Sequence, residues 1–466
     1  MSTYTGRQLC IGMIHFKAGD TDGVSLEMDK WQKVFRHEGH RVYYCCGQPP
    51  MNHENCTVIP SLSYFSEAVR ALDAGTFSTL EYYGSEETYE QALCEQVQTL
   101  TEDIGAWIKS TNLDVLIVEN IWSVGLHPAC AIALEQLVRE HNISVLAHHH
   151  DFYWERVKPM QLTCKAAMQF VDRYLPPHLP HITHVVINTK AQQDLQERKG
   201  ITATIIPNVF DFSQGPWQKD EYNADLRQVC GIEDNDILLL QATRVVRRKG
   251  IELAIDFAQS LQTHLEPFRG KMLYNGTRYG ENSKVVLALA GSTEHDGPGY
   301  LAQLQEKARE RQVILTYIGE KIGHTRATIH GKKQYSLWDS YVHADLVTYP
   351  SYWEGWGNQL LEAVRAKLPV VLFPYEIYRR DIRQAGFKMI ELGNEEDLAW
   401  DARTLAMLPQ AQIERAAKEA ITVLFDRQAR NDMVESNFKI GQEAFSLETL
   451  GTLLAPYTTA WSNTVW

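Results

Sequence analysis

Short apolar runs alternate along this chain with longer segments in which apolar residues recur at every third or fourth position. A short apolar run that ends in a turn-forming residue is typical of a buried strand, and the longer spacing is typical of an amphipathic helix. Strands are predicted at residues 9–16, 41–46, 115–118, 144–147, 184–187, 237–241, 285–289, 314–317, 346–348 and 370–373. Helices are predicted at residues 25–38, 251–261 and 358–366. This alternation indicates an α/β fold with parallel sheets and crossover helices.

The alternation restarts near the middle of the chain, after a polar stretch at residues 207–236. The stretch contains Pro207, Gly215 and Pro216 and has no long apolar run, so we interpret it as the crossing between two domains. Two doubly wound domains of about 200 residues each then account for the length. The Gly-rich segment at residues 267–284 is predicted to be a surface loop.

Composition and charge exclude several classes of protein. Of the 466 residues, 44% are hydrophobic and 22% are charged, which is ordinary for a globular chain. A formal net charge of −13 disfavours binding to nucleic acid, which needs a basic surface. No apolar run is long enough to predict a membrane-spanning helix, and the N-terminal run is too short for a secretory signal. The eight cysteines form no Cys-x-x-Cys pair, so zinc ribbons and thioredoxin-like redox sites have no support. Because the chain is long and shows no secretory signal, the cysteines are expected to be reduced thiols in the cytoplasm.

The strongest candidate for a site is the segment TYPSYWEGWGNQLLE at residues 348–362, which joins a strand to a helix. Gly355 and Gly357 are predicted to take positive φ and to let the backbone approach a ligand. Asn358 is predicted to be the N-cap of a helix whose N–H groups suit a phosphate or sugar hydroxyls. Glu354 precedes that helix and Glu362 lies one turn inside it, so the two acids would meet different parts of a ligand. The alternative is a plain strand–turn–helix junction with two solvated acids.

A basic run, QATRVVRRKG at residues 241–250, follows another predicted strand. It places four cations between Arg244 and Lys249, at the carboxyl end of a parallel strand. A diphosphate would be held there, unless the run is only a solvated basic turn.

Three consecutive histidines follow the strand at residues 144–147. Side chains alternate along a strand, so His148 and His150 should share one face and His149 should lie on the other. The run with Asp151 could supply part of a metal site, a buried histidine paired with Asp151, or a histidine that meets a ligand hydroxyl. A further loop at residues 17–25 has the right place for a ligand-facing glycine loop, but it lacks the Gly-x-Gly-x-x-Gly pattern of dinucleotide-binding proteins.

Taken together, these motifs resemble the retaining GT-B glycosyltransferases, notably glycosyltransferase family 4. Glu354 and Glu362 have seven residues between them, in a Ser-x-x-Glu-Gly-aromatic-Gly-Asn frame that is similar to the family's donor motif, and Arg244 and Lys249 match its basic pair. Residues 345–351 and 206–211 are also similar to family segments. Residues 149–156 and 335–339 resemble a bacterial branch that makes soluble glycosides and includes mannosylglucosylglycerate synthase and a trehalose-forming synthase.

The resemblance implies a GT-B fold with two Rossmann-like domains that face a central cleft. The acceptor-binding domain would cover residues 1–212, with a last helix within 446–466 returning to it. The nucleotide-sugar-binding domain would cover residues 213–445. The family pattern has Gly-Gly where this chain has Asp22-Gly23, and it has Gly at the positions of Lys367 and Val209. These departures leave the donor site intact and bear on the identity of the acceptor.

The resemblance also implies a role for each candidate residue. Arg244 and Lys249 would hold the diphosphate, Glu354 would contact the donor sugar, and Glu362 would accept from the ribose hydroxyls. The other implied contacts are the backbone of Gly355, Trp356, Gly357 and Asn358 with the sugar, Ile322 with the base, His150 or His149 with the reacting carbon, Asp22 and Gly23 with the acceptor, and Lys17 with an acceptor carboxylate.

The implied reaction moves a hexose from a nucleoside-diphosphate sugar, such as GDP-mannose or UDP-glucose, to a hydroxyl of a small soluble acceptor. That acceptor would be a sugar or a glycosylated hydroxy acid such as glucosylglycerate. No metal or other cofactor would be needed, because the cations neutralise the diphosphate, and no nucleic acid or stable membrane contact is expected. Two alternative functions stay open, a sugar-nucleotide epimerase and a non-catalytic nucleotide-sugar-binding subunit. Association into a homo-oligomer also stays open.

Overall fold

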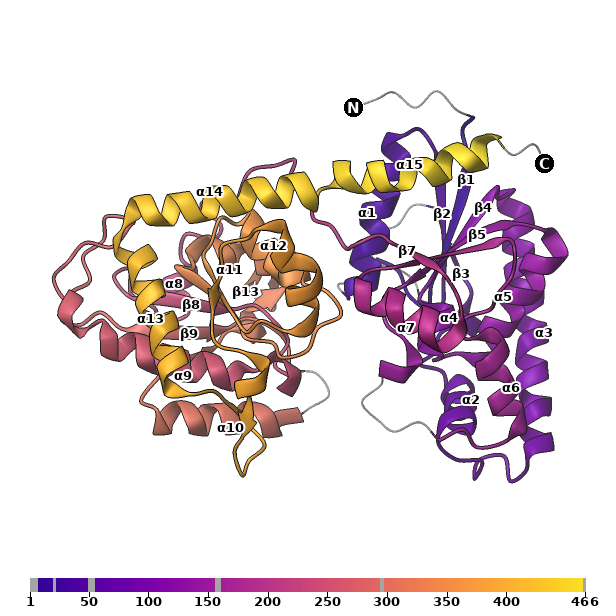
Figure 1. Cartoon of the computed structure of the whole chain (residues 1–466), viewed down its shortest axis with the longest axis horizontal. Helices are drawn as coiled ribbons and strands as arrows, with labels where there is room; N and C mark the ends of the chain where they lie inside the picture. Colours follow the sequence, from indigo (N-terminus) through magenta and orange to yellow (C-terminus); the bar gives the residue numbers. More distant parts are fainter. Residues whose placement is uncertain (1–6, 20–21, 49–54, 156–160, 294–296, 464–466) are drawn as a thin grey trace. The chain divides into compact units, whose positions relative to one another are not determined.

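The computed structural model describes residues 7–19, 22–48, 55–155, 161–293 and 297–463. The chain forms two compact units (Figure 1). Unit 1 comprises Met1–Val209 and Leu447–Trp466, and unit 2 comprises Phe210–Ser446. The chain therefore passes between the units at Val209–Phe210 and again at Ser446–Leu447.

Unit 1 is built on a parallel sheet of seven strands in the order β3-β2-β1-β4-β5-β6-β7. The strands are β1 (Cys10–Ile14), β2 (Arg41–Cys46), β3 (Cys56–Val58), β4 (Val115–Glu119), β5 (Ser144–His149), β6 (Ile182–Val186) and β7 (Ala203–Ile205). Its longer helices are α1 (Gly23–His37), α2 (Glu67–Phe77), α3 (Glu86–Thr111), α5 (Pro128–His141), α6 (Lys165–Tyr174), α7 (Thr189–Lys199) and α15 (Leu447–Asn463). The strand order reverses between β1 and β4, and ligands of such sheets bind beyond the carboxyl ends of the strands at that point.

Apolar side chains on both faces of this sheet are buried, as a doubly wound fold requires. Ile14 and Val118 pack on one face with α3 and α5, whereas Met13 and Ile117 pack on the other face. That second face is covered by α1 and by α15, which lie side by side (Figure 1).

Unit 2 is built on a parallel sheet of six strands in the order β10-β9-β8-β14-β15-β16. The strands are β8 (Ile237–Gln241), β9 (Val285–Leu289), β10 (Ile314–Tyr317), β14 (Leu346–Tyr349), β15 (Val370–Leu372) and β16 (Ile390–Glu391). Its longer helices are α9 (Ile251–His264), α10 (Gly297–Glu310), α11 (Leu337–His343), α12 (Asn358–Arg365), α13 (Gln410–Phe425) and α14 (Arg427–Ala444). A small sheet adds β11 (Ile322–Gly323), β12 (Ala327–Ile329) and β13 (Lys332–Ser336), and a hairpin pairs β17 (Ala399–Trp400) with β18 (Ala406–Met407).

The predicted fold class, two parallel-sheet Rossmann-like units, is confirmed, and each predicted strand coincides with an observed one to within a few residues. The first crossing between the units, Val209–Phe210, lies within the stretch at residues 207–236 that was predicted as the crossing, and the rest of that stretch belongs to unit 2, where Trp217 stacks on Trp338 with ring centroids 4.4 Å apart. One loop prediction needs correction. The segment at residues 267–284 is more than a surface loop, because Leu273 and Tyr279 are buried in the core of unit 2.

Two further observations bear on the setting of the protein. Among the described residues, no helix combines the length and the apolar character needed to cross a membrane. All eight cysteines lie within the described residues and carry free thiols.

Candidate active site

Two loops of unit 2 meet beyond the carboxyl ends of β8 and β14, at the reversal of the strand order. Gly250 ends the first loop with φ +59°, and its Cα lies so close to Pro350 of the second that a Cβ would collide with the Pro350 carbonyl oxygen. The backbone N–H of Tyr352 donates to the carbonyl of Arg248 over 3.1 Å. The two strongest sequence motifs are therefore joined at the place where this kind of sheet binds ligands.

A buried charge cluster occupies the junction of these loops. Lys249 donates to Oε1 of Glu354, and Arg248 Nη1 donates to Oε2 over 2.7 Å. Burial alone would raise the pKa of Glu354, but the two cations hold that pKa well below its usual range. Burial also lowers the pKa of Lys249, and Glu354 offsets only part of that effect. Two cations thus face one carboxylate, and the surplus positive charge suits a diphosphate.

The other cations of the basic run divide into two kinds. Arg244 is exposed, and its charge is one of the causes that lower the pKa of Lys249. Arg247 instead binds Thr404 Oγ1 over 3.1 Å and Gln303 over 2.8 Å. The cation that joins Lys249 at Glu354 is Arg248, which was not singled out in the sequence although it lies in the same run.

The N-terminus of α12 differs from the prediction. Gly357, not Asn358, is the N-cap, and its φ of −160° is extended. The predicted positive φ is therefore wrong at Gly357, and it is also wrong at Gly355, which is not one of the glycines with positive φ. Glycine is needed there for space, because a Cβ would lie 2.7 Å from the Tyr375 hydroxyl and 2.9 Å from Ile382 Cδ1. The ring of Trp356 is buried and packs on Phe445 with centroids 5.8 Å apart, so Trp356 offers a ligand its backbone rather than its ring.

Glu362 lies one turn into α12 and is buried. It accepts a hydrogen bond from the hydroxyl of Tyr341, on α11, over 2.8 Å. Tyr341 is fully enclosed and was not singled out in the sequence. Ile322 begins β11, directly after the short turn Gly319–Lys321. The predicted ribose and base contacts thus belong to the same unit as the charge cluster.

Unit 1 gathers a carboxylate and two histidines at the carboxyl ends of β4 and β5. Glu119 Oε2 lies 3.1 Å from His150 Nε2, to which it is hydrogen-bonded, and 3.0 Å from His148 Nδ1, which is not aligned for a hydrogen bond. All three side chains are buried. His148 and His150 share a face as predicted, but their acidic partner is Glu119 rather than Asp151. The three ligand atoms lie within 4.8 Å of one another, a spacing at which the set could hold a cation.

His149 faces away from this cluster. Its Nε2 lies 3.0 Å from Nδ1 of His184 in a hydrogen bond, and its ring lies beside Phe152. Burial and the neighbouring histidines lower the pKa of His149 far below its usual range. Of the two histidines considered for the reacting carbon, His150 is therefore the one that pairs with the buried carboxylate of Glu119, and His149 packs in the core.

The loop before α1 has a structural role that its sequence only partly indicated. Asp22 caps α1 by accepting from the N–H groups of Val24 and Ser25, and Gly23 begins the helix. Lys17 forms an ion pair with Asp22, with 3.2 Å between Nζ and Oδ2. Asp22 stands where the family pattern has glycine, and its carboxylate supplies this cap. Arg156, in the segment at residues 149–156, lies outside the described residues.

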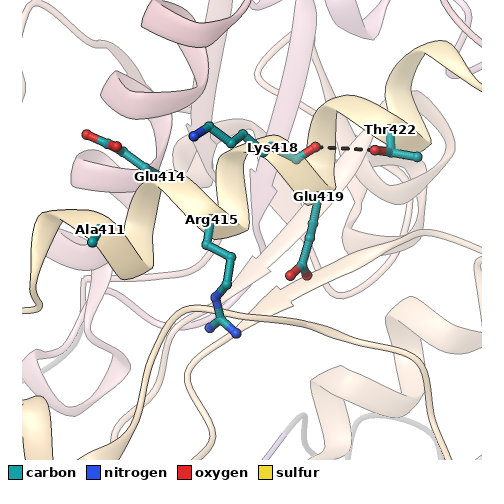
Figure 2. A pocket seen from close by; sticks show the side chains of 6 residues that line it. All are labelled: Ala411, Glu414, Arg415, Lys418, Glu419 and Thr422. Carbon is teal, nitrogen blue, oxygen red and sulfur yellow. Dashed lines mark hydrogen bonds between the residues drawn. The ribbon is translucent and has the colours of Figure 1, made fainter.

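A shallow depression lies on α13. It is lined by one face of the helix, with two acidic residues, Glu414 and Glu419, and two basic residues, Arg415 and Lys418 (Figure 2). Arg415 donates to the carbonyl of Glu391. The depression contains none of the predicted site residues.

Comparison with known proteins agrees with the geometry of the site. The family described as glycosyl transferases group 1 matches residues 223–439, which include both loops of the charge cluster. Two curated relatives are each named mannosylglucosylglycerate synthase. The protein from Petrotoga mobilis is 35% identical over 94% of this chain and 98% of its own length. The protein from Thermotoga maritima is 36% identical over 96% of this chain and 98% of its own length.

A solved structure supports the fold. The sucrose-phosphate synthase from Thermosynechococcus elongatus superimposes with a TM-score of 0.63 over 98% of this chain and 100% of that one. Its sequence is only 14% identical, so the likeness concerns the architecture of the two units.

Proposed function

Because this chain belongs to the glycosyl transferases group 1 family and is a nucleotide-sugar-dependent hexosyltransferase, we propose that it transfers the hexose to glucosylglycerate or a closely related small, soluble hydroxy-acid glycoside. The observation that carries the proposal is the cluster of Arg248, Lys249 and Glu354, which presents two cations and one carboxylate at the ligand-binding edge of unit 2. The names of the two relatives, which match almost the whole chain, support the acceptor and favour a mannosyl donor.

The cations act on the departing diphosphate. Breaking the glycosidic bond to the donor phosphate moves negative charge onto the leaving group while the sugar becomes oxocarbenium-like. Fixed positive charge in a buried site stabilises that transition state more than the ground state. Lys249 gives up part of its contact with Glu354 to the diphosphate, and Glu354 then accepts from hydroxyls of the donor sugar. Glu362, held by Tyr341, accepts from the ribose.

The transfer proceeds with retention, and the donor phosphate itself takes the proton of the acceptor hydroxyl. The charge cluster neutralises the diphosphate without a metal ion. Chelation should therefore leave the turnover number unchanged, whereas a reversible loss of activity with a chelator would contradict this part of the proposal. The acceptor binds to unit 1 near His150, where Lys17 exchanges part of its ion pair with Asp22 for the acceptor carboxylate.

The same proposal places the enzyme in the cytoplasm and away from membranes and nucleic acid. Free thiols at all eight cysteines agree with a reducing compartment. The net charge of −13 disfavours both anionic partners.

The test is release of nucleoside diphosphate from GDP-mannose and UDP-glucose, with and without glucosylglycerate. Release should require the acceptor, and Lys249→Ala should lower kcat/KM by roughly 30- to 1,000-fold, or about 2–4 kcal/mol. Lys307→Ala is the matched control, since Lys307, on α10, is also buried and binds Asp256 of α9 over 2.7 Å but belongs to neither loop of the charge cluster. Equal losses in both variants would refute the assigned site, and conversion of the donor alone would indicate an epimerase.

A further inference from the structure

Glu119 lies at the centre of a buried polar cluster in unit 1 that the donor chemistry does not use. It ends β4 beside the end of β5, and none of its side chain is exposed to solvent. A carboxylate buried in this way is costly unless a cation or several hydrogen bonds compensate it. The groups that surround Glu119 therefore indicate the role of its carboxylate.

His150 is fixed by two consecutive residues of unit 1. Its Nε2 pairs with Glu119 Oε2 over 3.1 Å. Its backbone N–H donates to Asn120 Oδ1 over 2.9 Å, and the N–H of Asp151 donates to the same atom over 3.1 Å. Asn120 has φ +59°, and Ser123 Oγ holds its side chain by donating to Oδ1 over 2.9 Å. Both the ring and the backbone of His150 are thus set by the pair Glu119–Asn120.

The other groups around the carboxylate meet it differently: His148 Nδ1 lies 3.0 Å from Glu119 Oε2 but is not aligned for a hydrogen bond. His15 Nδ1 binds the backbone oxygen of Glu119 over 2.8 Å, and Trp31 stacks on His148 with centroids 4.4 Å apart. Burial lowers the pKa of both His15 and His148. Burial would do the same at His150, but the hydrogen bond and charge of Glu119 outweigh it, so the pKa of His150 is raised; Asp151 and Glu27 act in the same direction.

We propose that Glu119 is a positioning residue for His150: its carboxylate keeps the proton on Nε2, orients the ring, and leaves Nδ1 as the nitrogen that meets the substrate. This rests on the proposed function, in which the acceptor binds to unit 1 near His150. Neutral His150 then accepts from a hydroxyl at Nδ1, and protonated His150 donates to a sugar oxygen there. Without Glu119 the ring can take the other tautomer and present the wrong hydrogen-bonding character.

The first test needs no activity. Nitrogen-15 spectra of the histidine rings of the whole protein, with the His150 signals assigned by their loss in His150→Gln, should show the neutral ring protonated at Nε2. In Glu119→Gln, which keeps the size of the side chain, the pKa of His150 should fall. Neutral His150 protonated at Nδ1 in the unaltered protein would overturn the proposal even if Glu119→Gln does not fold.

The second test uses kinetics. Glu119→Gln should lower kcat at least tenfold with less than a threefold change in KM for the donor, and should move the His150 limb of the pH profile to lower pH. Glu119→Asp, which keeps the carboxylate, should restore part of the lost kcat and part of the shift in the pH profile. Glu135→Gln is the matched control, since Glu135 is also a buried carboxylate in unit 1, paired with Arg139 on α5.

Three results would count against the proposal. The first is a pH profile of kcat whose His150 limb stays at the same pH in Glu119→Gln. The second is a double variant, Glu119→Gln with His150→Gln, whose loss of kcat equals the product of the two single losses. The third is stoichiometric metal that is bound by the unaltered protein and lost on substitution of Glu119. The last would make the cluster a metal site. Absence of hexosyl transfer in the unaltered protein would refute the proposed function, while the spectra would still decide the position of the proton.

Discussion

Lys249 and Glu354 form a buried ion pair in which each residue compensates the charge of the other. Each is buried, and each would be costly to ionise there without the other. The lysine is consequently held in place before any donor binds, and its proton is bound less tightly than in water. A preorganised charge of this kind costs little reorganisation when the diphosphate leaves.

The pH dependence of kcat/KM for the donor should follow the ionisation of Lys249. Since Lys249 acts in its charged form, kcat/KM should fall as pH rises through its pKa, which lies below the ordinary lysine value of about 10.4. Arg248 helps to lower that pKa, so Arg248→Ala should move the alkaline limb to higher pH, whatever it does to the rate. Arg247→Ala is the control, because Arg247 binds Thr404 instead. A limb at the same pH in Arg248→Ala would contradict the assignment.

Tyr341 should matter for nucleotide affinity rather than for the fold alone. Tyr341→Phe removes the hydrogen bond to Glu362, and calorimetry should find Kd for the nucleoside diphosphate raised about fivefold, or about 1 kcal/mol. Tyr274→Phe removes an equivalent bond to Asp345, which precedes β14 at the opposite end of the sheet, and should leave Kd unchanged. Equal Kd values in the two variants would argue against a ribose role for Glu362.

Residues that stand within a recognisable local motif could be predicted from the sequence even where their partners are distant, as Lys249 and Glu354 are at 105 positions apart. Glu354 and Lys249 could be predicted because each stands at a fixed place in a strand–loop–helix segment. Glu119 and Tyr341 could not, because each meets its partner across a sheet or between helices, and no local spacing connects residue 119 with residue 150.

At the level of elements, the buried strands were predictable because continuous apolar runs are required in a sheet covered on both faces. The helix start at α12 was less predictable, since Asn is a good N-cap by its own chemistry. The backbone instead uses Gly357, whose lack of a side chain makes room for Tyr375 and Ile382. Tertiary packing thus overrode a local preference by one residue.

The junction of the two donor loops should depend on Gly250. Gly250→Ala combines an unfavourable positive φ with a collision against Pro350, so urea titration should show the free energy of unfolding lowered by about 3 kcal/mol. Gly231→Ala, also in unit 2, has φ +71° but open space, and should cost about 1 kcal/mol. Equal costs would mean that the two loops are not in contact there.

The whole molecule should lose stability in acid in a defined window. The partners of Glu119 in unit 1 and of Glu354 in unit 2 hold the pKa of each carboxyl below its unfolded value. The stability that these groups contribute is therefore complete above pH of about 4.3 and is lost as pH falls toward the lower folded values. Urea titrations between pH 2 and pH 5 should show a steep dependence that is reduced in Glu119→Gln. An unchanged slope in that variant would contradict the pairing in unit 1.

The central claim is that the whole chain is a retaining hexosyltransferase with a soluble hydroxy-acid glycoside as its acceptor. The most direct measurement is proton NMR of the reaction of GDP-mannose with glucosylglycerate, followed from the first turnover. We predict one new glycosidic anomeric signal, with the configuration of the donor, that grows in step with release of GDP and disappears in Lys249→Ala. A product of inverted configuration, or consumption of the donor without a new glycoside, would contradict the account.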